Sequence, residues 1–183
     1  ARPVNYHLSA LKKLGMDYII KDGYIFAKTN GRLKGNIIKF PKISVGATEN
    51  SIIAACLAKG KTVLKNCAIE PEIKDLTNFL NSAGAKIKWF GRTCKILGTN
   101  SLNQTEYTVM ADRIEAGTFC VAATLTRGNL EIKDFNFNII RTELELLKKA
   151  GAKIKINNNK IKIIGPEKIK SVKNIKTKEW PGV

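Results

Sequence analysis

The sequence has little of what metal sites and membrane spans require. It contains one histidine, His7, and four cysteines that stand singly, with no Cys-x-x-Cys pair. Zinc sites are built from clusters of these side chains, so the sequence argues against one. No apolar run approaches the ~18 residues that cross a bilayer, and no signal-like start is present, so we expect a cytoplasmic protein without a membrane partner. Cys56 and Cys120 lie in apolar, helix-like runs and are expected to be buried.

Acidic residues are also scarce: 15 against 32 basic ones, for a formal net charge of +17. Such an excess is typical of proteins that bind nucleic acid. Here, however, lysine alternates with isoleucine, as in Lys153–Ile156 and Lys160–Ile163. This pattern indicates half-buried strands whose lysines face solvent and discourage edge pairing. We therefore interpret the charge as a solvated lysine coat, which is compatible with a small anionic substrate. A basic nucleic-acid-binding module is the alternative, and a steep salt dependence of binding would identify it.

Length and ends suggest part of a longer protein. The 183 residues, 44% of them hydrophobic, suffice for one or two domains. The chain begins at Ala1 without a methionine and ends, at Val183, in what resembles a turn. We interpret it as an internal fragment.

Segments of the sequence repeat. Residues 54–66 match residues 122–134 at an offset of 68, and residues 83–88 recur as 150–155. A third, partial copy covers residues 11–20. The period is too long for a solenoid and suits a supersecondary unit. We predict repeated βαβαββ units, with helices on one face of each sheet. The predicted helices cover residues 48–58, 72–80, 116–126 and 142–149, and they end at Gly60, Gly84, Gly128 and Gly151. The predicted strands cover residues 62–64, 86–90, 95–97, 130–132, 153–156 and 160–164.

One stretch, Lys42–Asn50, predicts an anion site. β-branched neighbours of Ser44 favour an extended backbone, and Gly46 permits a tight turn. A helix over residues 51–58, capped by Thr48 or Asn50, would follow. Because the first turn of a helix presents free N–H groups and a positive dipole end, phosphate or diphosphate would bind there beside Lys42. The alternative is an ordinary strand-to-helix turn.

A charge cluster, Asp112, Arg113 and Glu115, precedes a second predicted helix start. Capping of that helix by acidic side chains is the commoner role for such residues. A domain boundary near residues 107–110 would instead place the cluster at an interdomain cleft, opposite the anion site.

Several stretches together resemble the enolpyruvyl transferase family. They are Ala1–His7, Gly31–Gly35, Lys42–Thr48, Glu70–Ile73, Asp112–Thr118 and Pro181–Gly182. The resemblance runs in order over the whole chain. It implies an α+β fold, an inverse α/β barrel of two domains, each assembled from βαβαββ units. Residues 1–108 would be the later part of the first domain, and residues 109–183 the first part of the second.

The resemblance also implies the roles of individual residues. Arg2 matches a catalytic arginine that contacts the phosphate of phosphoenolpyruvate, and a guanidinium fork suits that group. Pro3, Val4, Asn5 and Tyr6 match the segment that holds the uracil and ribose, and His7 matches a histidine near the site. The diphosphate cradle corresponds to Lys42, Ile43, Ser44 and Val45, with Gly46 beside it. Asn5 is a departure, because many members of the family have aspartate there.

The implied reaction transfers the enolpyruvyl group of phosphoenolpyruvate to the 3-hydroxyl of UDP-N-acetylglucosamine, the first committed step of peptidoglycan synthesis, without a cofactor. A member of the same family that uses 3-phosphoshikimate as acceptor is the alternative. The family's reactive cysteine and a catalytic aspartate would lie outside Ala1–Val183, so none of the four cysteines takes that role and the fragment alone is expected to be inactive.

Overall fold

The computed structural model describes residues 4–175, 177 and 179–180. Arg2 and Pro3, two of the predicted site residues, lie outside the described residues. The chain divides between Val109 and Met110 into two compact units.

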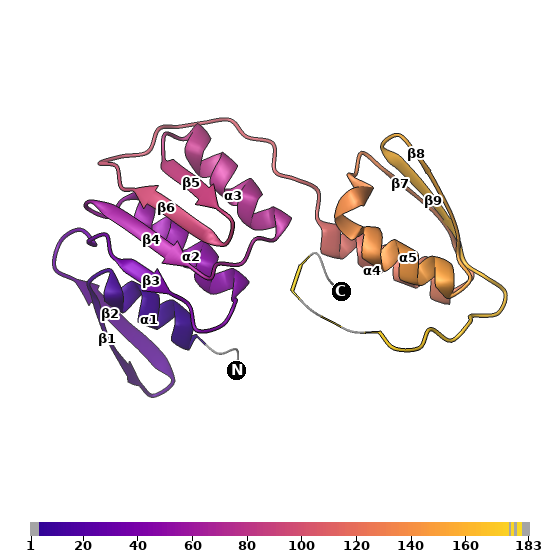
Figure 1. Ribbon diagram of the computed structural model, residues 1–183, viewed down its shortest axis with the longest axis horizontal. Helices are drawn as coiled ribbons and strands as arrows, with labels where there is room; N and C mark the ends of the chain where they lie inside the picture. The colour runs from indigo at the N-terminus through magenta and orange to yellow at the C-terminus, as the bar shows by residue number, and fades with distance from the viewer. Residues whose placement is uncertain (1–3, 176, 178, 181–183) are drawn as a thin grey trace. The chain divides into compact units, whose positions relative to one another are not determined.

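The first unit contains three helices and six strands (Figure 1). The helices are α1 (Asn5–Lys13), α2 (Val45–Cys56) and α3 (Pro71–Ser82). The strands are β1 (Met16–Lys21), β2 (Tyr24–Thr29), β3 (Ile37–Lys39), β4 (Lys61–Lys65), β5 (Lys86–Phe90) and β6 (Thr93–Leu97). Strands β1 and β2 form a hairpin of their own, and the other four form a sheet in the order β3-β4-β6-β5, in which only β3 and β4 are parallel.

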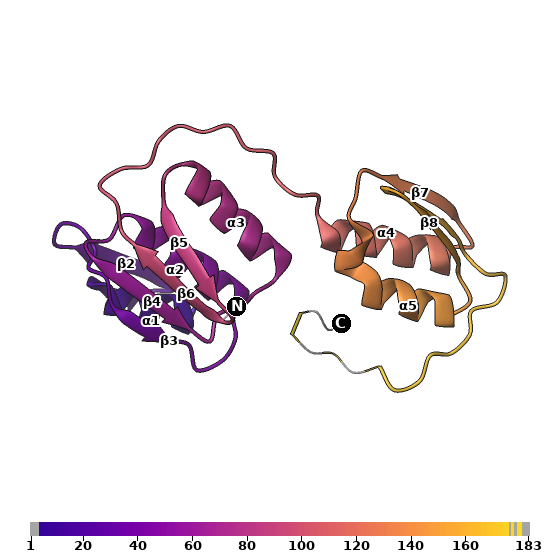
Figure 2. The ribbon, with the colours of Figure 1, turned by 45° about the horizontal axis from the view of Figure 1, so that its top comes forward.

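The second unit is smaller. Its elements are α4 (Arg113–Leu125), β7 (Asn129–Lys133), a 3-10 turn η1 (Phe137–Ile140), α5 (Arg141–Lys149), β8 (Lys153–Asn157) and β9 (Lys160–Ile164). The sheet order is β7-β9-β8, antiparallel throughout. Helices α4 and α5 lie side by side and contact one face of this sheet (Figure 2).

Each unit has its own apolar core. In the first, α2 and α3 bury Ile52, Ile73 and Leu80 against Leu64 and Ile96 of the sheet. In the second, Cys120 and Leu144 pack against Ile161 and Ile163. The predicted α+β class is therefore confirmed, and in each unit helices pack against the sheet.

The first unit has the predicted βαβαββ order, but the second lacks the first strand among the described residues. Residues 105–112 form no strand. The segment is held elsewhere: the Tyr107 hydroxyl donates to Asp75 Oδ1 at 2.8 Å, and its ring packs edge-on against Phe79 with the centroids 5.5 Å apart. Because Tyr107 is bound to α3 of the first unit, this stretch does not pair with β7 as β3 pairs with β4.

The predicted helix over residues 51–58 was wrong in its start and its cap. Helix α2 begins at Val45, and Ser44 caps it with an extended backbone (φ −146°, ψ 118°). Gly46 lies in the first turn of the helix and makes no tight turn. Thr48 is not a cap; it is a helical residue, fully buried, whose hydroxyl is satisfied locally.

Two of the four glycines that were predicted to end helices do so. Gly84 (φ +96°) and Gly151 (φ +107°) follow the C-cap residues of α3 and α5, Ala83 and Ala150, and adopt the left-handed conformation. Gly60 (φ +86°) lies in the turn before β4, four residues after α2 ends. After α4 the left-handed residue is Arg127, not Gly128.

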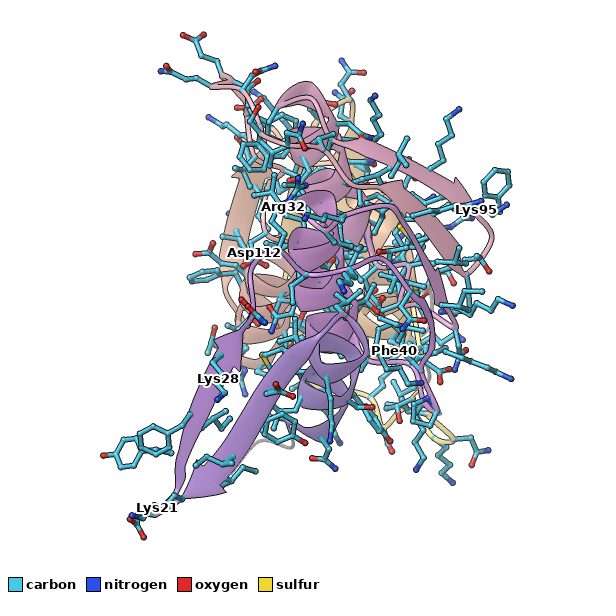
Figure 3. The ribbon with its side chains drawn as sticks, turned by 90° about the vertical axis from the view of Figure 1, so that its left-hand side faces the viewer. Lys21, Lys28, Arg32, Phe40, Lys95 and Asp112 are labelled. Carbon is cyan, nitrogen blue, oxygen red and sulfur yellow. The ribbon has the colours of Figure 1, made fainter. Side chains whose placement is uncertain are left out.

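The lysine coat is confirmed on both sheets. On the first, the face away from the helices carries Lys39, Lys61, Lys65, Lys86, Lys88 and Lys95, of which Lys95 is half-buried and the others are exposed. Figure 3 shows Lys95 projecting from this face, with its ammonium 4.3 Å from the centre of the Phe90 ring. The alternation of lysine and isoleucine therefore reports half-buried strands.

The hairpin β1–β2 extends from the first unit, with Lys21 near its tip (Figure 3). It carries apolar side chains that nothing covers within the described residues: Ile19, Tyr24 and Phe26 are 63%, 71% and 55% exposed.

None of the described helices is long and apolar enough to cross a bilayer.

All four cysteines are buried and unpaired. Burial raises the pKa of Cys56, Cys67 and Cys120 to about 11, and it raises the pKa of Cys94 further. The thiol, not the thiolate, is therefore the form present at neutral pH.

We predict that Gly84→Ala lowers the free energy of unfolding by about 1 kcal/mol, because an L side chain disfavours the left-handed backbone. The matched control is Gly117→Ala, inside α4, where an added Cβ meets nothing within 4 Å. That control should raise stability, since alanine is the better helix former. Urea unfolding measures both changes in stability, provided that the slope of the unfolding free energy against urea concentration is the same in all variants. Equal effects of the two substitutions would contradict the assignment of Gly84.

We also predict that the four cysteines react with a thiol reagent at pH 8 roughly a hundredfold more slowly in the native protein than in guanidinium chloride, because burial suppresses the thiolate. Stopped-flow absorbance on variants that each retain one of these cysteines gives the rate for every site. A single fast thiol in the native protein would show that this cysteine is accessible and would contradict its buried placement.

Candidate functional site

The N-terminus of α2 presents unused backbone donors. The first intrahelical bond is Thr48 N–H to the Ser44 carbonyl at 3.1 Å, and Ala47 N–H donates to Ser44 Oγ at 3.4 Å. The N–H groups of Val45 and Gly46 precede these bonds, and neither has an acceptor within the part of the chain that the structure describes. Together with the positive end of the helix dipole, these donors favour an anion.

Buried hydrogen bonds hold this helix end in place. The Thr48 hydroxyl donates to the Ser44 carbonyl at 2.7 Å and accepts from Ala68 N–H at 3.1 Å. The Ser51 hydroxyl donates to the Ala47 carbonyl at 2.7 Å. Ile43 and Val45 pack their side chains against the first core. Their backbones, rather than their side chains, are therefore what the site can use.

Helix α1 brings the second predicted stretch to the same place. Val4 and Asn5 are exposed at its start, and Tyr6 packs against the core. The His7 ring lies against Gly46: a Cβ on Gly46 would stand 3.0 Å from His7 Cε1 and 3.4 Å from Nε2. Residues 4–7 and 42–46, far apart in sequence, are therefore neighbours, and Gly46 is needed here for close approach.

Asn50 contacts the same ring at a neighbouring atom. Its Nδ2 lies 2.7 Å from His7 Nδ1. Asn50 is four residues after Gly46, so the two lie on one face of α2, one turn apart. The sequence analysis predicted Asn50 only as a possible helix cap, which was wrong because Ser44 caps α2. Its spacing of four residues from Gly46 indicates a shared helix face only once the start of α2 is known.

Carboxylates border the site. Burial, and then the nearby Glu72 and Glu70, raise the pKa of Glu49, whereas His7 lowers it. Glu70 is 7% exposed at the start of α3, and its Oε2 accepts no hydrogen bond within the described residues. In the sequence, Glu70–Ile73 is one of the stretches that resemble the enolpyruvyl transferase family, and no separate role is predicted for Glu70. Glu49, Glu70 and Glu72 therefore form a local acidic cluster within a first unit that carries a net positive charge.

Arg32 and Asp112, from two of the remaining stretches, have structural roles, and Pro181–Gly182 lie outside the described residues. The Arg32 side chain, labelled in Figure 3, donates from Nε to the Leu57 carbonyl at 2.9 Å and from Nη1 to Asn100 Oδ1 at 2.6 Å, which joins the end of α2 to the loop after β6. Asp112 caps α4: its Oδ1 accepts from the N–H groups of Ile114 at 2.7 Å and Glu115 at 3.1 Å. Capping, the commoner role for such an acid, is thus confirmed for Asp112, and a role at a cleft stays a prediction.

The arrangement suits recognition of a phosphorylated small molecule. It combines two free backbone donors, a helix dipole, the exposed Lys42 and an imidazole. The cysteines described in this unit, Cys56, Cys67 and Cys94, are buried with raised pKa values, so none of them is an activated nucleophile. The site can bind and orient an anionic ligand.

Comparisons with known proteins agree with the family resemblance found in the sequence. The profile of EPSP synthase (3-phosphoshikimate 1-carboxyvinyltransferase) matches residues 1–181. The chain is 58% identical over 182 residues to UDP-N-acetylglucosamine 1-carboxyvinyltransferase of Pelagibacter ubique, covering 99% of this chain and 43% of that protein. The protein of the same name from Rickettsia bellii is 44% identical and is covered to 43%. The chain thus spans less than half the length of the curated relatives it matches.

Solved structures share the fold. The enolpyruvyl transferase NikO from Streptomyces tendae superposes with a TM-score of 0.84 at 21% identity, covering all of this chain and 46% of that one. EPSP synthase from Acinetobacter baumannii gives 0.64 at 21% identity, covering 90% of this chain and 40% of the other. The resemblance inferred from the sequence motifs is confirmed by the profile match and by the identities: the chain belongs to the EPSP synthase family of enolpyruvyl transferases.

Proposed function

We propose that this chain is part of an enzyme that transfers the enolpyruvyl group of phosphoenolpyruvate to the 3-hydroxyl of UDP-N-acetylglucosamine, in the cytoplasm, for peptidoglycan synthesis. The observation that carries the proposal is the 58% identity to a protein of that name over 99% of the chain. The open N-terminus of α2, with Lys42 and His7 beside it, supports it independently, because a diphosphate needs such donors.

In this proposal the first unit holds the nucleotide sugar. The backbone of Ile43–Gly46 and the ammonium of Lys42 bind the diphosphate, and Pro3–Tyr6 hold the uracil and ribose. Arg2 contacts the phosphate of phosphoenolpyruvate. Its guanidinium would stabilise the negative charge on the phosphate as that group leaves. The remaining reacting groups belong to parts of the longer enzyme.

We further propose that the two units belong to different domains, residues 1–108 to the first and 109–183 to the second. The division between Val109 and Met110 supports this assignment. The uncovered apolar side chains of β1–β2 support a first domain larger than the described unit, because a soluble domain buries such surface. Closure of two domains on the substrate would exclude water from a reactive intermediate.

The acceptor distinguishes this proposal from its alternative within the family. The family profile and one superposing structure carry the name of EPSP synthase, whose acceptor is 3-phosphoshikimate. The two curated relatives compared above, at 58% and 44% identity, carry the UDP-N-acetylglucosamine name. We therefore favour the nucleotide sugar.

We predict that Lys42→Ala in the full-length enzyme raises the KM for UDP-N-acetylglucosamine roughly tenfold or more, with a smaller change in the KM for phosphoenolpyruvate, because a charge-assisted contact to the diphosphate is lost. The matched control is Lys39→Ala, an exposed lysine on the open face of β3. Phosphate release with each acceptor is the measurement.

Two outcomes would contradict the proposal: one would overturn the identity of the acceptor, and the other the assignment of the binding site. Phosphate release with 3-phosphoshikimate but not with UDP-N-acetylglucosamine would overturn the acceptor. Unchanged kinetics of Lys42→Ala, in an enzyme that does use the nucleotide sugar, would overturn the assignment of the site.

A further inference from the structure

We propose that Asn50 is a positioning residue for the nucleotide-sugar site, and that it acts by fixing the tautomer and the orientation of the His7 imidazole. This inference rests on the function proposed above. It concerns a residue that none of the family motifs quoted earlier includes.

The contact defines the protonation of the ring. Asn50 Nδ2 is an amide nitrogen, which only donates, and it lies 2.7 Å from His7 Nδ1. Nδ1 therefore accepts, and the proton of the neutral ring sits on Nε2. A free imidazole would exchange between tautomers, so this bond selects the one that has its donor at Nε2.

The packing defines where that donor lies. Cε1, the atom between the two ring nitrogens, is the ring atom closest to the position of a Cβ on Gly46, and Nε2 is the next. Nδ1 is held by Asn50, one helical turn further along α2. The ring thus packs against the first turn of α2, and Nε2 lies near Gly46, whose backbone N–H has no acceptor within the described residues.

The three donors together favour a ligand with negatively charged oxygens. Two backbone N–H groups and one imidazole N–H can offer hydrogen bonds to the oxygens of a diphosphate, and the exposed Lys42 lies two residues before the cap Ser44. A ring of the opposite tautomer would turn a lone pair toward those oxygens and repel them. The gain from Asn50 is therefore expressed in ligand binding rather than in the folding of the unit.

The bond itself is a surface one, since Asn50 is exposed and His7 half-buried. Its removal should cost little stability. It should remove one oriented donor from the ligand, which corresponds to about a tenfold weaker binding.

The test is a double-mutant cycle in the full-length enzyme with His7→Gln, Asn50→Leu and both together. Leucine has nearly the shape of asparagine but no donor. We expect Asn50→Leu to raise the KM for UDP-N-acetylglucosamine about tenfold with kcat within twofold, and we expect the double variant to match His7→Gln alone, because Asn50 acts through the ring. Asn129→Leu, on an exposed position of β7, is the control for the change of side chain. Multiplicative effects in the cycle, or a fall in kcat instead of a rise in KM, would overturn the proposal.

A second measurement does not depend on activity. With 15N-labelled histidine, and with the His7→Gln variant to assign the signals, the ring nitrogen shifts of His7 report the tautomer directly. We expect the Nε2–H tautomer in the wild type and a mixture in Asn50→Leu. An Nδ1–H ring in the wild type would overturn this proposal even in an enzyme that uses UDP-N-acetylglucosamine; lack of that activity with an Nε2–H ring would overturn the proposed function instead.

Discussion

The hydroxyl of Thr48 ties the first turn of helix α2 to the loop that follows β4. It donates to the Ser44 carbonyl and accepts from Ala68 N–H, and it is completely buried while doing so. A buried hydroxyl with both partners satisfied is hard to displace, because an unpaired polar group in the core is costly. The start of α2 is therefore fixed relative to the sheet. The positions of Lys42, the free N–H groups and the surface on which His7 rests all follow from it.

The two units show why a duplicated scaffold has this site in only one of its copies. The helix α2 is capped by a neutral serine, whereas the corresponding helix α4 is capped by Asp112, whose carboxylate already accepts two of the first N–H groups. A carboxylate at that position both occupies the donors and cancels the attraction of the dipole for an anion. The N-terminus of α4 is thus closed to phosphate, and that of α2 is open.

Much of the scaffold could be predicted from the sequence because it depends on local patterns. The lysine–isoleucine alternation gives the hairpins, and the Asn157–Asn159 turn supplies the left-handed residue Asn158 that the β8–β9 hairpin requires. What could not be predicted depends on tertiary contacts. Helix α2 starts at Val45 because Ser44 is held extended and Thr48 finds a partner in Ala68, and no propensity reveals that. The contact of His7 with Gly46 and Asn50 joins two helices, so neither helix implies it alone.

We propose that the backbone donors at the start of α2 bind the diphosphate of the nucleotide sugar. The most direct measurement is a titration of the 15N-labelled full-length enzyme with UDP-N-acetylglucosamine, followed by the amide signals of Val45 and Gly46. We expect both signals to shift as the binding site is saturated with ligand, because each N–H gains a charged acceptor. Amide signals of Val45 and Gly46 that stay in place while others respond to the bound ligand would contradict it.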